Sequence, residues 1–120
     1  MPTSAIDRML AEARAQLDRV EAADLDAEVA GGALVVDIRP VELRMRDGEL
    51  EGALVIDRNV LEWRLDPTSP ARVPEADADR RVILFCDEGY ASSLAALTLR
   101  ALGVRRATDL VGGFQALLAL

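Results

Sequence analysis

Short apolar runs alternate along this chain with segments whose apolar residues recur at helical spacing. The runs are nearly continuous and rich in β-branched residues, as is typical of strands buried on both faces of a parallel sheet. They predict strands at 33–36, 53–56 and 81–85, with a short fourth strand at 107–111. The helical spacing predicts helices at 4–17, 21–29, 41–46, 59–65, 90–102 and 114–120. Strands separated by helices predict an α/β fold with a mostly parallel sheet flanked by helices.

Residues that start and stop helices fall at the ends of these segments. Thr3 or Ser4 can cap the first helix, and Asn59 can cap the helix that ends before Pro67. The stretch 66–81 contains three prolines and four acidic residues, so we predict a loop there. Long surface loops move more than the elements they connect, and this one is predicted to be the most mobile segment.

Composition and charge limit the partners of the protein. With 120 residues, 51% of them hydrophobic and 29% charged, the chain can bury one core and is not disordered. Fourteen basic and twenty-one acidic residues give a net charge of −7. No basic stripe offsets this charge, so we predict no nucleic-acid partner and no membrane partner.

The chain has no histidine and a single cysteine, Cys86. These counts exclude a histidine general base, an internal disulfide and a cysteine-cluster zinc site, and we predict neither a metal nor a cofactor. The first ten residues do not read as a secretory signal, and no stretch of eighteen apolar residues occurs. Together with the lone thiol, this pattern predicts a cytoplasmic protein.

Cys86 lies at the carboxyl end of the predicted strand 81–85, where open α/β sheets bind their ligands. If the segment 86–92 wraps between strand and helix, its backbone N–H groups and the helix N-terminus can favour a thiolate without histidine. Gly89 gives the freedom for a tight loop, and Ser92 and Ser93 can cap the helix or donate hydroxyl hydrogen bonds. The alternative interpretation is that Cys86 is a small buried hydrophobic residue.

Four motifs resemble those of the rhodanese-like (sulfurtransferase) family, in the same order and with fitting spacing. They are the strand ending in Asp-x-Arg at 34–40, a counterpart of Gly-His-Ile-Pro-Gly-Ala at 48–53, the active-site loop at 86–92 and the Gly-Gly before the last helix at 110–114. The resemblance implies a rhodanese-like three-layer fold over 19–120, a mostly parallel sheet flanked by helices. An N-terminal helical extension would occupy 1–18.

The resemblance also implies an enzyme, a sulfurtransferase that carries sulfane sulfur as a persulfide on Cys86. A small sulfur donor would load the cysteine, and a thiol, cyanide or a protein thiol would accept the sulfur. The family's loop residues, which would cradle the persulfide, correspond here to Asp87, Glu88, Gly89, Tyr90, Ala91 and Ser92. Asp37 and Arg39 correspond to a supporting ion pair. Arg58 follows a neighbouring strand and could supply positive potential.

Several positions depart from the family pattern. Glu49 and Glu51 replace the His and Pro of the second motif, and Ala91 stands where many members carry Arg. Asp87 and Glu88 place two negative charges beside the thiol, which disfavours a thiolate and repels thiosulfate. We therefore do not expect thiosulfate to be the physiological donor.

Two other functions compete with sulfur transfer. A cysteine phosphatase needs an arginine at Cys-x5-Arg spacing, but that position is Ser92. A non-catalytic binding module, or a redox or persulfide sensor, remains the alternative of another class. Because no second cysteine is present, either function requires a thiol partner. The first helix could pack on the domain or face a second subunit, so the pattern leaves a monomer and a homodimer open.

Overall fold

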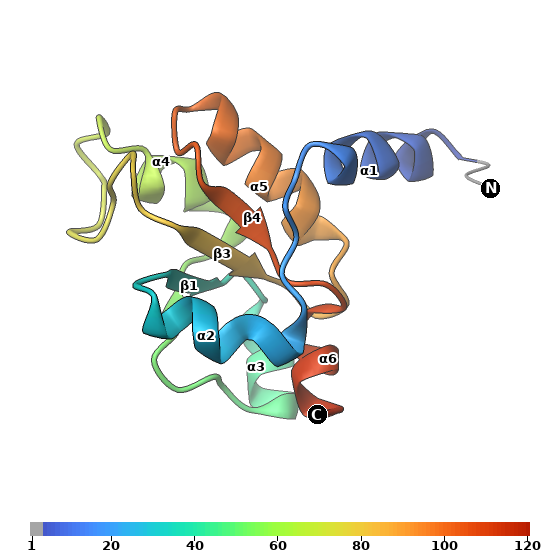
Figure 1. Cartoon of the computed structure of the whole chain (residues 1–120). Coiled ribbons are helices and arrows are strands. Elements are labelled where there is room, and N and C mark those ends of the chain that lie inside the picture. Colours follow the sequence, from blue (N-terminus) through green and yellow to red (C-terminus); the bar gives the residue numbers. More distant parts are fainter. Residues whose placement is uncertain (1–3) are drawn as a thin grey trace.

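The computed structural model describes residues 4–120. In this part of the chain, the sheet at the centre of the molecule has four parallel strands (Figure 1). The strands lie in the order β2 (Leu54–Val55), β1 (Leu34–Asp37), β3 (Val82–Phe85), β4 (Ala107–Asp109). Every residue of β1 and β3 is buried, which explains their continuous apolar runs. The predicted α/β fold with a parallel sheet is confirmed.

Within residues 4–120, six α-helices surround this sheet. They are α1 (Ala5–Ala15), α2 (Leu25–Ala30), α3 (Val41–Asp47), α4 (Leu61–Leu65), α5 (Ala91–Ala101) and α6 (Gly113–Leu118). Single 3-10 turns precede α2 and α4 at Ala22–Asp24 and Arg58–Val60. All six predicted helices are present, and their ends lie within a few residues of the predicted ends. The segment 66–81 forms neither helix nor strand, as predicted.

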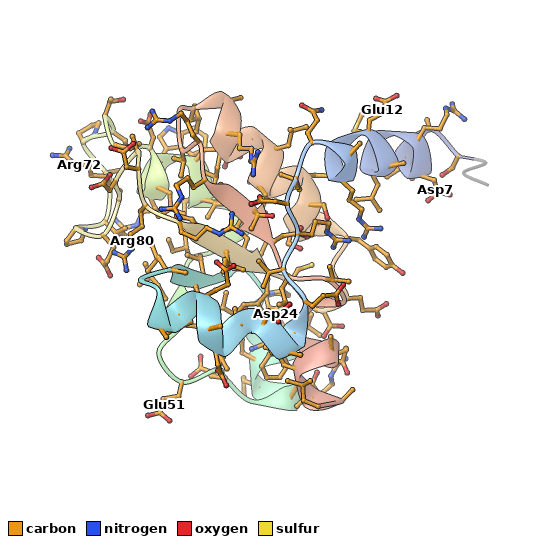
Figure 2. All side chains as sticks on the ribbon, in the orientation of Figure 1. Asp7, Glu12, Asp24, Glu51, Arg72 and Arg80 are labelled. Atoms are coloured by element: carbon orange, nitrogen blue, oxygen red, sulfur yellow. The ribbon has the colours of Figure 1, made fainter. Side chains whose placement is uncertain are left out.

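The alternation of side chains along the strands gives the sheet two apolar faces. Val36 and Leu84 point to the face covered by α4 and α5. Val35 and Ile83 point to the opposite face, where Phe114 of α6 packs. Figure 1 shows α4 and α5 on one side of the sheet and α2 and α6 on the other. Charged side chains such as those of Glu12, Glu51 and Arg72 lie at the outside of the molecule (Figure 2). The three layers therefore follow from strand periodicity.

One of the predicted helix caps is confirmed and another is wrong. Ser4 caps α1, because its hydroxyl accepts a hydrogen bond from the Asp7 N–H at 3.0 Å. Thr3 lies outside the described residues. Asn59 is not a cap. The carboxylate of Asp57 accepts a bond from the Asn59 N–H at 2.8 Å, so the helical turn begins two residues earlier than predicted. The Ile56 N–H still bonds to the sheet, which makes Asp57 the first residue free to cap.

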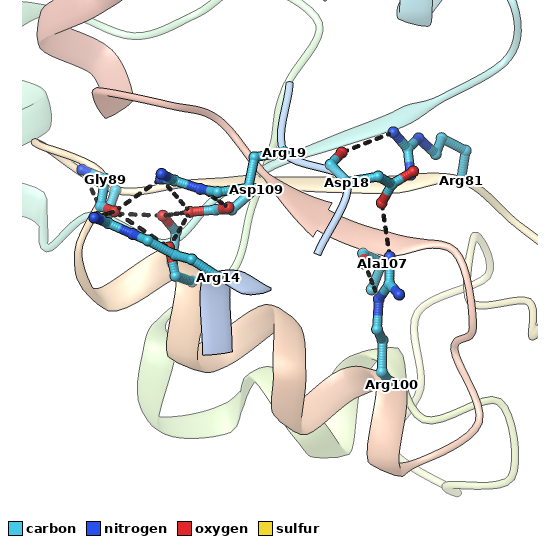
Figure 3. A network of polar contacts seen from close by, with 11 residues as sticks. Arg14, Asp18, Arg19, Arg81, Gly89, Arg100, Ala107 and Asp109 are labelled. Atoms are coloured by element: carbon cyan, nitrogen blue, oxygen red, sulfur yellow. Dashed lines mark hydrogen bonds and ion pairs between the residues drawn. The ribbon is translucent and has the colours of Figure 1, made fainter. Parts of the chain in front are cut away.

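The N-terminal helix packs on the domain and does not stand apart from it. α1 lies against α5, with Ala13 buried between them. The chain that follows is fastened by Asp18, which pairs with Arg81 at 2.9 Å and with Arg100 at 2.7 Å (Figure 3). Partial burial, the largest single influence, acts to raise the pKa of Asp18. The hydrogen bond from Arg81, a backbone hydrogen bond and the charges of Arg81 and Arg100 together outweigh it, so the pKa is lowered. Within residues 4–120, no helix is long and apolar enough to cross a membrane.

Candidate active site around Cys86

Cys86 directly follows β3 and begins the loop that leads into α5. Its thiol is almost fully buried, and the Gly89 N–H donates a hydrogen bond to Cys86 Sγ at 3.2 Å. Gly89 has a φ of +87°, and a Cβ on it would lie 2.8 Å from the backbone N of Gly112. The loop can therefore close around the sulfur only with glycine at this position. Among residues 4–120, Gly89 supplies the one backbone amide bonded to this sulfur. A wider amide cradle for the outer persulfide sulfur stays a prediction.

Ser92 and Ser93 lie beneath the sulfur and do not cap α5. The residue at the N-cap position is Tyr90, without a side-chain cap bond. Both serines are fully buried, and each hydroxyl lies 2.7 Å from the Oδ2 atom of Asp109. The Cys86 S–H can donate to Ser92 Oγ, which lies 3.3 Å from the sulfur. The two hydroxyls therefore act as donors to a carboxylate, which is the second of the two predicted roles.

Asp109 is the last residue of β4 and carries a fully buried carboxylate. Arg19 binds this carboxylate through two hydrogen bonds, from Nε to Oδ1 at 2.8 Å and from Nη2 to Oδ2 at 3.1 Å. Four hydrogen bonds thus hold the negative charge, which offsets the cost of burying it. Sequence reasoning did not single out Asp109. An acidic side chain within the short apolar strand 107–111 was the signal that could have found it.

Two arginines from the N-terminal part of the chain hold the outer side of the loop (Figure 3). Arg14 of α1 donates to the carbonyl oxygen of Gly89 at 2.7 Å, and Arg19 donates to the same oxygen at 3.1 Å. The Arg14 guanidinium also lies 5.6 Å from the ring centroid of Tyr90 and 3.3 Å from Ser93 Oγ. Gly89, whose N–H contacts the Cys86 sulfur, is therefore also held at its carbonyl oxygen by two charged donors. Sequence reasoning did not predict either contact.

Removing the Arg14 side chain is expected to loosen this loop. We expect Arg14→Ala to lower the free energy of unfolding by about 1–2 kcal/mol, the value of a partly buried charged hydrogen bond. It should also slow the reaction of the Cys86 thiol with a thiol-specific reagent by roughly tenfold, while Arg14→Lys, which keeps the charge, restores part of that rate. Denaturant unfolding and the rate of Cys86 modification measure the two effects. Arg8→Ala, at an exposed position on the same helix, is the control. An equal response of both alanine variants would contradict the assigned contact.

Asp37 and Arg39 form the ion pair expected from the motif at 34–40. Both side chains are buried, and Arg39 Nη2 lies 2.8 Å from Asp37 Oδ2. The same guanidinium donates to the carbonyl of Gly48 at 2.9 Å and stacks 3.8 Å from the centroid of the Phe114 ring. The pair therefore joins the end of β1 to α3 and α6, the elements that flank the site.

A cavity of about 440 Å³ opens beside the Cys86 sulfur. Its walls are mainly apolar, with Ile38, Pro40, Leu43, Tyr90 and Ala91 as the uncharged contributors. Arg58 lines it as well, but its guanidinium is paired with Glu62 at 2.9 Å, so the positive potential expected from Arg58 is largely compensated. The cavity thus places the Cys86 thiol beside a mainly apolar wall.

The two acidic residues of the loop differ in their surroundings. Asp87 accepts a hydrogen bond from Gln115 at 2.9 Å and lies 3.4 Å from an Arg46 nitrogen. Gln115 and Arg46 both also bind Asp47, and the hydrogen bond from Arg46 is the main reason why the pKa of Asp47 is lowered. Glu88 is exposed at the cavity mouth. The charge of Asp87 is therefore shared with a cation, while that of Glu88 faces solvent.

Comparisons with known proteins agree with this fold. The family model for the rhodanese-like domain matches residues 21–120. A protein of unknown function from Rhodopseudomonas palustris, described as a possible tyrosine phosphatase, is 32% identical with a TM-score of 0.86 over 99% of this chain and 95% of that one. This span includes α1. No curated protein sequence matches the chain.

Two further structures are similar to this chain. A rhodanese homologue from Thermus thermophilus is 30% identical, with a TM-score of 0.61 over 82% of this chain and 98% of that one. A human single-domain sulfurtransferase is 26% identical, with a TM-score of 0.68 over 84% of this chain and 95% of that one. Both likenesses cover nearly the whole of the similar protein.

Proposed function

The chain belongs to the rhodanese-like domain family, and we propose that it is a sulfurtransferase acting through a persulfide on Cys86. The observation that carries the proposal is the Cys86 thiol at the carboxyl end of β3, with the Gly89 N–H at 3.2 Å and an open cavity beside it. The likeness to a human single-domain sulfurtransferase supports the same activity. A thiol that is only a core residue needs neither the donor nor the cavity.

The contacts of the sulfur indicate how a thiolate is held. Once the thiol proton leaves to solvent, the Gly89 N–H remains as a donor to the sulfur. The Ser92 hydroxyl can then turn from Asp109 towards the sulfur, because Ser93 and Arg19 still satisfy the carboxylate. The positive end of α5 adds to this stabilisation. Backbone and hydroxyl donors thus replace the histidine that the chain lacks.

Sulfur transfer then proceeds in two balanced steps. The Cys86 thiolate attacks the sulfane sulfur of the donor, the donor's sulfur–sulfur bond breaks, and the donor leaves with the electron pair. A thiolate or cyanide acceptor next attacks the outer sulfur of the persulfide, which releases the Cys86 thiolate. Because the chain has one cysteine, the acceptor is another molecule. A reducing, cytoplasmic compartment fits this use of a free thiol.

Intact-mass measurement tests the proposal. After incubation with propyl persulfide, inorganic polysulfide or thiosulfate, we expect a gain of about 32 Da, one sulfur atom, on the sole thiolate nucleophile, with thiosulfate the weakest donor. Cyanide should remove the added mass and yield thiocyanate, and Cys86→Ser should gain nothing. If none of these donors adds sulfur to the wild-type protein, the sulfurtransferase proposal is wrong. Loading without discharge to any acceptor would instead favour a persulfide sensor.

The description of the Rhodopseudomonas protein as a possible tyrosine phosphatase makes phosphate transfer the second candidate. The segment 86–92 contains no arginine that could bind phosphate in two places. The nearby Arg14 is already bonded to the Gly89 carbonyl. We therefore rank phosphatase activity below sulfur transfer. Hydrolysis of p-nitrophenyl phosphate that disappears in Cys86→Ser would reverse this order.

A further inference from the structure

We propose that the cavity beside Cys86 selects small organic persulfides and thiols with an uncharged apolar group, and not inorganic anions such as thiosulfate. This inference rests on the proposed function, because the transferred sulfur atom is the one that a sulfurtransferase would move. What it adds is the chemical class of the molecule that carries the sulfur. The cavity volume of about 440 Å³ lies in the range of small-molecule sites and far exceeds the need of a small anion.

The walls of the cavity favour an apolar group next to the reacting sulfur. Ile38 and Pro40 follow β1, Leu43 comes from α3, and Tyr90 and Ala91 come from the loop and α5. All five contribute carbon surface to one opening around the Cys86 sulfur. An alkyl or aryl group on the substrate sulfur would remove this surface from water when bound.

The charges at the cavity disfavour an anion. Both guanidinium groups that line the cavity already form salt bridges, Arg39 with Asp37 at 2.8 Å and Arg58 with Glu62 at 2.9 Å. Glu88 is exposed at the mouth, and Ala91 is an apolar residue in the wall. A dianion such as thiosulfate would exchange its hydration for apolar walls and a carboxylate. An uncharged group bears neither cost.

The transfer step for this substrate class is balanced without any other reactant. The Cys86 thiolate attacks the outer sulfur of R–S–SH, the bond between the two substrate sulfurs breaks, and R–S⁻ leaves with the electron pair. The thiolate R–S⁻ then takes up the proton that the Cys86 thiol released. During the step the apolar group R stays in the cavity and aligns the sulfur with the nucleophile.

Neutral thiol reagents test the cavity without requiring sulfur transfer. Methyl, propyl and pentyl methanethiosulfonate each transfer R–S to the Cys86 thiolate and release methanesulfinate. Their rates with the protein are divided by their rates with free cysteine. We expect each pair of added methylene groups to raise this ratio by roughly tenfold, as burial of apolar surface predicts. The 2-carboxyethyl reagent, which carries an anion, should react more slowly than the propyl reagent by at least tenfold.

A matched pair of variants on α3 locates the effect. Leu43 lines the cavity, whereas Met45 is 81% exposed and does not. Leu43→Lys should flatten the dependence on chain length and raise the relative rate of the carboxyethyl reagent, because it replaces apolar wall with a cation. Met45→Lys should leave both unchanged. Rates that ignore chain length in the wild type, or equal effects of both variants, would overturn the proposal.

The chain-length selectivity of the cavity and the sulfurtransferase activity can be tested separately. A protein that gains sulfur from polysulfide but shows no chain-length dependence is a sulfurtransferase without the inferred selectivity. A protein that shows the dependence but gains no sulfur from any donor has the apolar site, and the proposed function fails. When both hold, propanethiol should discharge the Cys86 persulfide at least tenfold faster than 3-mercaptopropionate.

Discussion

Replacing Arg39 by alanine is expected to lower the free energy of unfolding by about 3–5 kcal/mol, because it leaves the carboxylate of Asp37 buried without a partner. Both side chains are buried, and three side-chain hydrogen bonds between them are lost together. The substitution also removes the donor to the Gly48 carbonyl and the group stacked on Phe114. Phe114 adjoins the loop at 86–92, because its N–H donates to the Cys86 carbonyl oxygen at 2.9 Å.

Denaturant unfolding measures this effect, and the double variant Asp37→Asn with Arg39→Leu separates charge from packing. We expect the double variant to be more stable than Arg39→Ala, since it leaves no unpaired buried charge. Arg105→Ala is the surface control, because Arg105 and its partner Asp79 are both largely exposed and such pairs contribute at most about 1 kcal/mol. If Arg39→Ala costs no more than Arg105→Ala, the ion pair does not support the fold as described.

Asp109→Asn is expected to weaken both the fold and the reactivity of Cys86. The amide cannot replace a carboxylate that accepts two bonds from Arg19 and one from each buried serine. We expect a loss of about 3 kcal/mol in the free energy of unfolding, as for a broken buried ion pair. Because Ser92 and the loop lose their common anchor, persulfide formation should slow by roughly tenfold or more.

The two serines provide a matched control for this prediction. Each donates to the same Asp109 oxygen at 2.7 Å, but only Ser92 is bonded to the Cys86 sulfur. Ser92→Ala and Ser93→Ala should therefore cost similar amounts of stability, about 1 kcal/mol each. Ser92→Ala alone should slow persulfide formation. If Ser93→Ala slows it equally, the hydroxyl at the sulfur has no separate role, and Asp109 acts through loop stability only.

Much of the fold could be predicted because its determinants are local. The β-branched runs at 34–36 and 82–85 fix buried strands, and helical spacing identifies all six helices. The boundaries were harder. The predicted strand 53–56 is observed as β2 at Leu54–Val55, followed by one further bond from the Ile56 N–H to Asp37; the Ala53 N–H bonds to Leu50 and not to the sheet. The cap at Asp57 was missed for the same kind of reason, since it depends on where pairing to β1 ends.

The same distinction between local and distant determinants applies to the candidate site. The place of Cys86 after a buried strand, and the need for Gly89 in a tight loop, follow from residues adjacent in the sequence. Arg14 and Arg19 are separated from Gly89 by seventy-five and seventy positions in the sequence, and no local pattern predicts their contacts with it. The sequence left two roles open for Ser92 and Ser93, helix capping and hydroxyl donation. In the structure both hydroxyls donate to the distant Asp109.

The sequence by itself therefore determined the parallel sheet, the order of its elements along the chain and the place of Cys86 at a strand end, because hydrophobic periodicity and strand ends are local properties. Only the tertiary structure decided what surrounds the Cys86 thiol. The order β2-β1-β3-β4 brings the ends of β1, β3 and β4 together, and α1 packs on α5 so that Arg14 reaches the loop. Buried polar groups need partners wherever the chain can supply them, and here the cation paired with Asp109 and both arginines bonded to the Gly89 carbonyl come from the N-terminal segment.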